Sequence, residues 1–120
     1  MTTSETGRLG ERAAADWLRR EGFELLDTNW RDGRYEIDIV ARRLDELHFV
    51  EVKTRRAGGL TDPEAALTPA KQQALLKAAR SYVALRRWPG EICFDLAAVD
   101  VLPDGSMQVR FIPDALQTHW

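Results

Sequence analysis

The sequence predicts a single α/β domain with the element order α-β-β-β-α-β-β, in which helices flank a mixed central sheet. Three observations support this prediction. Two segments repeat apolar residues at helical spacing. Other, shorter segments of strand length either alternate apolar and polar residues or are apolar throughout. Glycine, proline and aspartate stand between the segments, where turns are needed. A chain of 120 residues can bury one core and is too short for two, so we assign residues 1–120 to one domain.

The first two predicted elements are a helix and a short strand. Apolar residues recur at helical spacing through residues 9–18, and Gly22 follows as a stop signal. Residues 1–6 precede this pattern and are expected to be a flexible N-terminus. Residues 23–30 are predicted to form the first strand, which is closed by an Asp-Gly turn.

Two longer strands are predicted at residues 34–43 and 47–55. The period of two along a pleated strand places Tyr35, Ile37 and Ile39 on one face of the first of them. The opposite face of that strand and one face of the next strand collect charged residues. The two faces of each strand therefore differ in chemistry.

We expect these two strands to form an antiparallel hairpin, closed by a loop of two or four residues that includes Leu44. Both loop lengths give one register, in which Asp38 lies opposite Glu51 and Glu36 lies opposite Lys53. Directly opposed residues share a face and hold their Cβ atoms about 4.5–5.5 Å apart. This register brings two carboxylates together with the Lys53 ammonium on the same side, whereas a loop of odd length would break the opposition.

The remaining predicted elements are a helix and two strands. Residues 56–68 contain glycine and proline and are predicted to be a mobile loop. Thr68 is the expected N-cap of a helix that has Pro69 at its first position and ends before a Pro-Gly pair. Residues 92–102 and 107–112 are predicted strands joined by a Pro-Asp-Gly turn.

Asp38 and Glu51 are the candidate metal ligands. Like charges opposed across a sheet are destabilising, so the pair needs a compensating cation, a nearby lysine or a shared proton. A divalent cation fits, because Mg²⁺ at phosphoryl-transfer sites is held by one or two carboxylates, with water and phosphate at the other positions. Lys53 could then stabilise the phosphate or orient the attacking water. The alternative is a surface hairpin in which Glu36 and Lys53 form an exposed pair.

Five further residues are candidates for the same site. Lys71 and Gln72 project from the start of the second helix toward the sheet, where helix-end amides also favour phosphate. Lys71 could equally be an ordinary lysine that passes the edge of the core. Arg55 and Arg56 are candidate phosphate contacts. Glu11 projects to the margin of the apolar face of the first helix, where it could add a carboxylate or be an ordinary first-turn acid.

The composition limits the function. The chain has 17 basic and 19 acidic residues, a net charge of −2, so nucleic-acid binding would depend on local clusters of basic residues. The single cysteine, Cys93, excludes an internal disulfide or a cysteine metal site and is expected to be a core thiol. His48 alternates away from Glu51 and is not expected to be a catalytic base. No segment resembles a signal peptide or a membrane span, so we expect a cytoplasmic protein with no membrane partner.

Several segments together resemble the YraN family of small bacterial proteins. They are Gly7–Glu11, Ala14–Leu18, Gly22-Phe23, Asn29, Glu36–Val40, Phe49–Arg55, Lys71 and Phe94-Asp95. That family is similar to archaeal Holliday-junction resolvases and to the restriction-endonuclease-like, or PD-(D/E)xK, fold. The resemblance implies that fold. It also puts Glu11, Asp38, Glu51 and Lys53 at the active-site positions of the resolvases, with the Val52 carbonyl as a metal ligand.

The function implied by the resemblance is a metal-dependent endonuclease that acts on structured or branched DNA in repair or recombination, with Mg²⁺ or Mn²⁺ as cofactor. Resolvases of this kind act as dimers, and Phe111 and Trp120 are candidates for a homodimer interface. Two residues depart from the family pattern: Tyr35 stands where a glycine is usual, and Cys93 where an arginine is common. The alternative hypothesis is a nuclease-like fold that binds nucleic acid or recruits a protein partner without catalysis.

Overall fold

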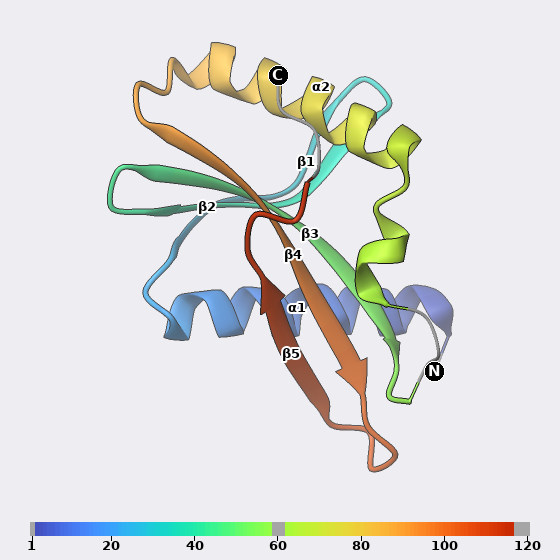
Figure 1. Ribbon diagram of the computed structural model, residues 1–120. Coiled ribbons are helices and arrows are strands. Elements are labelled where there is room, and N and C mark those ends of the chain that lie inside the picture. Colours follow the sequence, from blue (N-terminus) through green and yellow to red (C-terminus); the bar gives the residue numbers. More distant parts are fainter. Residues whose placement is uncertain (1, 59–61, 117–120) are drawn as a thin grey trace.

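The computed structural model describes residues 2–58 and 62–116. Within them the elements follow the predicted order, which confirms the α/β prediction (Figure 1). The elements are α1 (Thr3–Arg20), β1 (Glu24–Asp32), β2 (Tyr35–Arg43), β3 (Glu46–Arg56), the short 3-10 helix η1 (Pro63–Ala66), α2 (Pro69–Arg86), β4 (Glu91–Val101) and β5 (Met107–Ile112).

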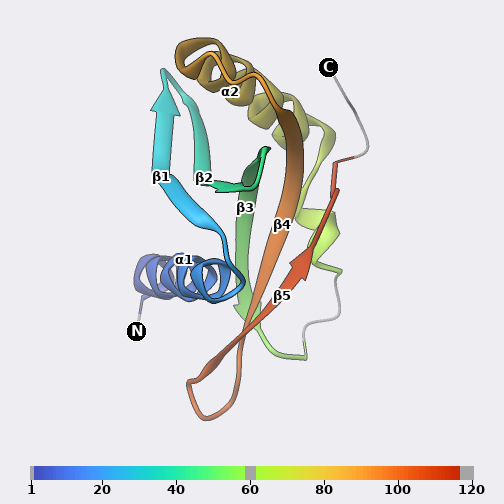
Figure 2. The ribbon, with the colours of Figure 1, turned by 90° about the vertical axis from the view of Figure 1, so that its left-hand side faces the viewer.

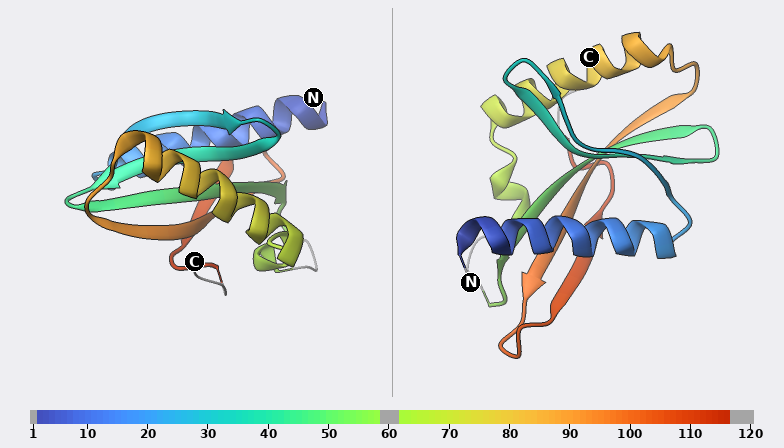
Figure 3. Two further views of the ribbon diagram at one scale, coloured as in Figure 1. Left: turned by 90° about the horizontal axis from the view of Figure 1, so that it is seen from above. Right: turned by 180° about the vertical axis from the view of Figure 1, so that it is seen from behind.

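In this described part of the chain, five strands form one sheet in the order β1-β2-β3-β4-β5. β3 and β4 are parallel, while the other neighbouring strands are antiparallel. A parallel pair needs a crossover connection, and α2 lies in that connection. The sheet is therefore mixed, as predicted, with α1 across one face and α2 over the other (Figure 2; Figure 3).

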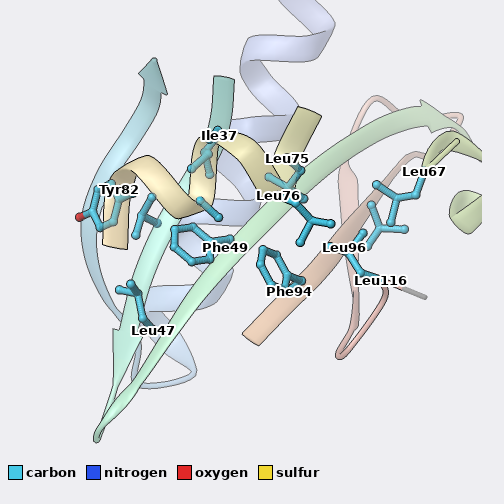
Figure 4. Packing of buried hydrophobic residues seen from close by; sticks show 13 residues of the cluster. Ile37, Leu47, Phe49, Leu67, Leu75, Leu76, Tyr82, Phe94, Leu96 and Leu116 are labelled. Atoms are coloured by element: carbon cyan, nitrogen blue, oxygen red, sulfur yellow. The ribbon is translucent and has the colours of Figure 1, made fainter. Parts of the chain in front are cut away.

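Each helix covers its own apolar cluster. Under α2, the Phe49 ring packs between Tyr82 and Phe94, with ring centroids 5.8 Å and 5.4 Å away (Figure 4). Under α1, Leu18 and Val50 belong to the second cluster. Because Phe49 and Val50 are fully buried on opposite faces, β3 is held from both sides and is a rigid support for the polar residues that follow it.

β1 and β2 bend together at Asn29 and Asp38. Asn29 has a left-handed backbone (φ 51°), and the pairing between the two strands passes over these two residues. Ile37 then belongs to the cluster under α2, whereas Ile39 belongs to the cluster under α1. The prediction that Tyr35 and Ile37 share a face with Ile39 is therefore wrong, because the strand changes direction between them.

Two segments predicted to be flexible contain regular structure. α1 begins at Thr3, and the hydroxyl of Thr2 caps it by accepting the Glu5 N–H at 3.1 Å. The described residues up to position 6, expected to be flexible, are therefore the cap and first residues of a helix, which a polar cap and not the apolar spacing starts. The predicted loop 56–68 includes η1, and its residues 59–61 lie outside the described residues.

Phe111, one of the two aromatic residues proposed for a dimer interface, packs against residues of its own domain. Phe111 is stacked on Trp17, with ring centroids 5.2 Å apart, and also contacts Phe23. It therefore belongs to the packing between β5 and α1, while Trp120 lies outside the described residues. Among the helices described, none combines the length and the apolar character needed to cross a bilayer.

Candidate functional site

The candidate site lies where β2 separates from β3. The two strands pair in the predicted antiparallel register up to Ile39 and Val50, and the ladder stops one step before Asp38 and Glu51. At that step the Val52 N–H donates to Asp38 Oδ2 at 2.8 Å. The Asp38 side chain thus replaces a backbone acceptor, which fixes one of its carboxylate oxygens against β3.

The predicted pairing of Glu36 with Lys53 is wrong. In the described part of the chain, Glu36 Oε2 lies 3.3 Å from the guanidinium of Arg31 in β1. The reason is the bend in β2, which carries Glu36 away from β3 while the strand stays paired with β1. Lys53 remains an exposed side chain on β3.

Asp38 and Glu51 interact electrostatically. Burial, followed by the charge of Glu51, raises the pKa of Asp38 to about 7, although the Val52 N–H and Lys71 act in the opposite direction. Glu51 is 6% exposed, so water screens the interaction weakly. Near neutral pH Asp38 therefore holds a proton part of the time, and a nearby cation favours its ionised form.

Lys71 supplies such a cation in this structure. Its Nζ lies 2.9 Å from Glu51 Oε1, and this hydrogen bond raises the pKa of Lys71. The Thr68 hydroxyl accepts the Lys71 N–H at 3.2 Å, so the predicted N-cap also orients the turn that carries the lysine. The Gln72 amide donates to the Leu67 carbonyl at 2.9 Å and ties the start of α2 to the preceding loop.

The end of β3 lines two adjoining pockets. One, of about 610 Å³, lies beside the N-terminal half of α1 and is lined by Glu11, Lys53 and Arg56, among others. The other, of about 430 Å³, also includes Lys53, Arg55 and Arg56. Arg55 Nε lies 3.2 Å from Asp100 Oδ1, so part of its charge is neutralised within the sheet.

Glu11 reaches the site from α1. It lines a pocket of about 220 Å³ together with Asn29 and Asp38. Burial raises the pKa of Glu11, and the charge of Asp38 adds to this effect, while a hydrogen bond with Asn29 opposes it. The approach of α1 depends on Gly10, because a Cβ at that position would overlap the side chain of Thr54. A carboxyl group from α1 thus lies near the carboxyl pair of the sheet.

Sequence reasoning gave no role to Gly10 or Asn29, although both support the site. A glycine inside a helix costs stability relative to alanine, so its presence is a signal of close packing. Asparagine tolerates a left-handed backbone better than most residues, which makes it a signal of a bend within a strand. Each signal is local, but its meaning depends on Thr54 and Asp38, which are distant in sequence.

Comparison with known proteins identifies the family of this chain. The family described as "Uncharacterised protein family UPF0102" matches residues 10–99, a span that includes every candidate site residue. The chain belongs to this family. The assignment confirms the predicted resemblance to YraN.

Individual UPF0102 proteins align over most of the chain. One from Nitratidesulfovibrio vulgaris (strain DP4) is 45% identical over 95 residues, which cover 78% of this chain and 71% of that protein. One from Syntrophomonas wolfei is 38% identical over 112 residues, which cover 92% of this chain and 96% of that protein. One from Oleidesulfovibrio alaskensis is 45% identical over 94 residues, which cover 78% of this chain and 46% of that protein. The chain therefore spans about half the length of this last relative.

Proposed function

We propose that this UPF0102 protein is a metal-dependent endonuclease in which Asp38, Glu51 and the Val52 carbonyl hold Mg²⁺ or Mn²⁺. The observation that carries the proposal is the carboxyl pair at the separation of β2 and β3, where the pKa of Asp38 is raised to about 7. The donors are all oxygens, which Mg²⁺ and Mn²⁺ prefer, so the residues present fit these cations. When bound, the cation supplies positive charge to the phosphate and lowers the pKa of a nearby water.

The ion pair between Lys71 and Glu51 is a resting state of this site. Lys71 neutralises Glu51, and its side chain is 50% exposed and therefore able to move. Glu51 would exchange the Lys71 ammonium for the divalent cation when the cation is held at the site. Once displaced, Lys71 remains at the start of α2, where it can contact a phosphate.

Lys53 and Glu11 act on the water and the phosphate. Both line the pocket of about 610 Å³ beside the end of β3. The Lys53 ammonium orients the attacking water and balances the charge that develops on the phosphate. Glu11, whose pKa burial raises, accepts a hydrogen bond or a proton close to Asp38.

The substrate that we propose is structured or branched DNA. Lys53, Arg55 and Arg56 line adjoining pockets at the end of β3, so basic groups gather at one edge of a chain whose net charge is −2. Such groups attract phosphates without reading base sequence. The preference for branched DNA rests on the resemblance to resolvases, and a homodimer is proposed on the same ground.

A second candidate function is binding of nucleic acid or of a protein partner without catalysis. The observation that favours it is the 2.9 Å contact between Lys71 and Glu51, which neutralises a proposed metal ligand within the protein itself. A permanent ion pair at this position would leave the end of β3 as a binding surface.

Cleavage of labelled DNA tests the proposed nuclease directly. Duplex, single-stranded, flap and four-way-junction substrates would be incubated with Mg²⁺, Mn²⁺ or EDTA. We expect cleavage that requires the metal and falls by about 10²-fold or more in Lys53→Ala, because a charged group in contact with the reacting phosphate is lost. The matched control is Lys77→Ala, which removes an exposed lysine in the middle of α2.

The outcomes separate the two candidate functions. Equal cleavage by Lys53→Ala and the wild type would contradict the role assigned to Lys53. Binding that weakens steeply with salt, without cleavage of any substrate, would favour the binding function. Absence of DNA binding at low salt would point to a protein partner instead.

A further inference from the structure

A second group of metal-ligating side chains lies at the start of β3 and β4, apart from the carboxyl pair. Parallel pairing sets His48 directly beside Cys93, and Glu46 precedes His48 by two residues on the same face. The ligand atoms of Glu46, His48 and Cys93 all lie within 4.8 Å of one another. The His48 ring meets the edge of Phe23 on the α1 side of the sheet, whereas Glu51 contacts α2.

The His48 ring is held in one orientation. Its Nδ1 lies 2.6 Å from Asp95 Oδ2, and Asp95 is 2% exposed. The other oxygen of Asp95 accepts the Asp114 N–H at 3.0 Å, so the carboxylate itself cannot turn. This leaves His48 Nε2 directed at Glu46 Oε1, 3.1 Å away. A carboxylate that holds one ring nitrogen while the other faces the ligand position is the usual arrangement behind a metal-bound histidine.

We infer that Glu46, His48 and Cys93 form a second metal site, which binds Zn²⁺ or a similar transition-metal ion. Imidazole, thiolate and carboxylate are the donors that Zn²⁺ takes, and three protein ligands leave one coordination position open. Mg²⁺ disfavours such a set because it prefers oxygen donors, so the two sites of this chain select different ions. This site departs from the expectation that Cys93 is a core thiol and no metal ligand, because histidine and glutamate supply the other ligands here.

The charges around the cluster favour a cation, because the carboxylates of Asp95 and Glu46 lie 2.6 Å and 3.1 Å from the two nitrogens of His48. Binding of the ion would release to solvent any proton that the Cys93 thiol or His48 Nε2 carries. The three ligands would then join the beginnings of β3 and β4.

The test is titration of the purified, tag-free protein with Co²⁺ in excess Mg²⁺, followed by displacement with Zn²⁺. Co²⁺ bound to a thiolate gives a sulfur-to-metal charge-transfer band in the near ultraviolet. We expect this band to saturate at one Co²⁺ per chain and to disappear with Zn²⁺. Cys93→Ser should abolish the band, whereas Asp38→Asn should retain it, because Asp38 belongs to the other site.

Two further measurements keep the inference testable if a buried variant unfolds. Glu46→Gln changes a half-buried side chain and should weaken Zn²⁺ binding on the order of tenfold or more. In the wild type, Zn²⁺ should slow alkylation of Cys93, which is the single thiol of the chain. Absence of the charge-transfer band, or an alkylation rate that Zn²⁺ does not change, would show that the cluster is only a hydrogen-bonded His48–Asp95 pair.

Discussion

At the scale of single residues, Asp38 is the group on which the candidate site depends. One of its oxygens accepts the Val52 N–H, so the residue is structural as well as acidic. Burial and then the charges of Glu51 and Glu36 raise its pKa, and Lys71 lowers it. Substitutions here should therefore change stability as well as activity, and the two effects can be separated by pH and by metal.

Asp38→Asn should make the stability of the metal-free protein less dependent on pH. The folded pKa of Asp38, about 7, lies above its ordinary value of 3.8, so the native state binds this proton more tightly than the unfolded state. Stability is then lost as pH rises from about 4 to about 7. Asparagine can still accept the Val52 N–H but does not ionise. Urea unfolding in EDTA should show that the free energy of unfolding of the variant increases relative to that of the wild type as pH rises. A constant difference between the two proteins across this range would contradict the raised pKa of Asp38.

Lys71→Gln should destabilise the metal-free protein by about 1–3 kcal/mol at neutral pH, because it leaves the buried Glu51 carboxylate without its cation. Added Mg²⁺ should stabilise the variant more than the wild type, since the cation no longer competes with an ammonium. Thermal unfolding with and without Mg²⁺ measures both effects. Lys77→Gln is the control. Equal stabilisation of the wild type and both variants by Mg²⁺ would show that Lys71 does not compete with the metal for Glu51.

At the scale of elements, the site exists because α1 lies close to β3 while β2 bends away from it. Gly10 permits the close approach of α1 to β3, since a Cβ there would overlap Thr54. Asn29, which lies opposite Asp38, permits the bend of β2 through its left-handed backbone. Neither residue carries the proposed chemistry, yet both set the distance between Glu11 and the carboxyl pair.

Gly10→Ala and Gly7→Ala should change stability in opposite directions. Both glycines lie in α1, where alanine is favoured by about 0.5–1 kcal/mol. A Cβ at Gly7 meets nothing within 4 Å, so this variant should be more stable than the wild type. A Cβ at Gly10 forces α1 away from Thr54, which should cost about 1–3 kcal/mol. Urea unfolding of the two variants compares them, and equal stabilisation would mean that the helix contact is not tight.

At the scale of the whole molecule, the proposed DNA binding depends on where the basic residues lie and not on the net charge. The net charge of −2 does not favour DNA, but Lys53, Arg55 and Arg56 line adjoining pockets at the end of β3. Arg55 is paired with Asp100, whereas Arg56 is exposed at the end of β3. The proposed DNA contact is therefore at this edge.

Arg56→Ala should reduce the salt dependence of DNA binding. Loss of one phosphate contact lowers the slope of log K against log salt by about 0.9 for duplex DNA. Arg20→Ala is the control, because it removes an exposed arginine at the far end of α1 from Glu11. Fluorescence anisotropy over a range of salt concentrations measures both slopes. The same slope for Arg56→Ala and the wild type would place the DNA elsewhere on the protein.

Local patterns in the sequence were enough for much of the fold. The order of elements, the Thr68 cap and the register of the β2–β3 hairpin follow from turn residues, caps and the period of two, which act between near neighbours. The proximity of Asp38 to Glu51 follows from that register. The start of α1 at Thr3 was missed because the first turn has a polar cap and little apolar periodicity.

The sequence by itself determined which residues carry charge on neighbouring strands, since strand periodicity and a short loop are local. The tertiary structure decided which of these charges meet. The bend at Asn29 separated Glu36 from Lys53, and the crossover through α2 brought Lys71 to Glu51 and set Cys93 beside His48. Such contacts depend on how distant elements pack, because the clusters under α1 and α2 hold the helices against the sheet.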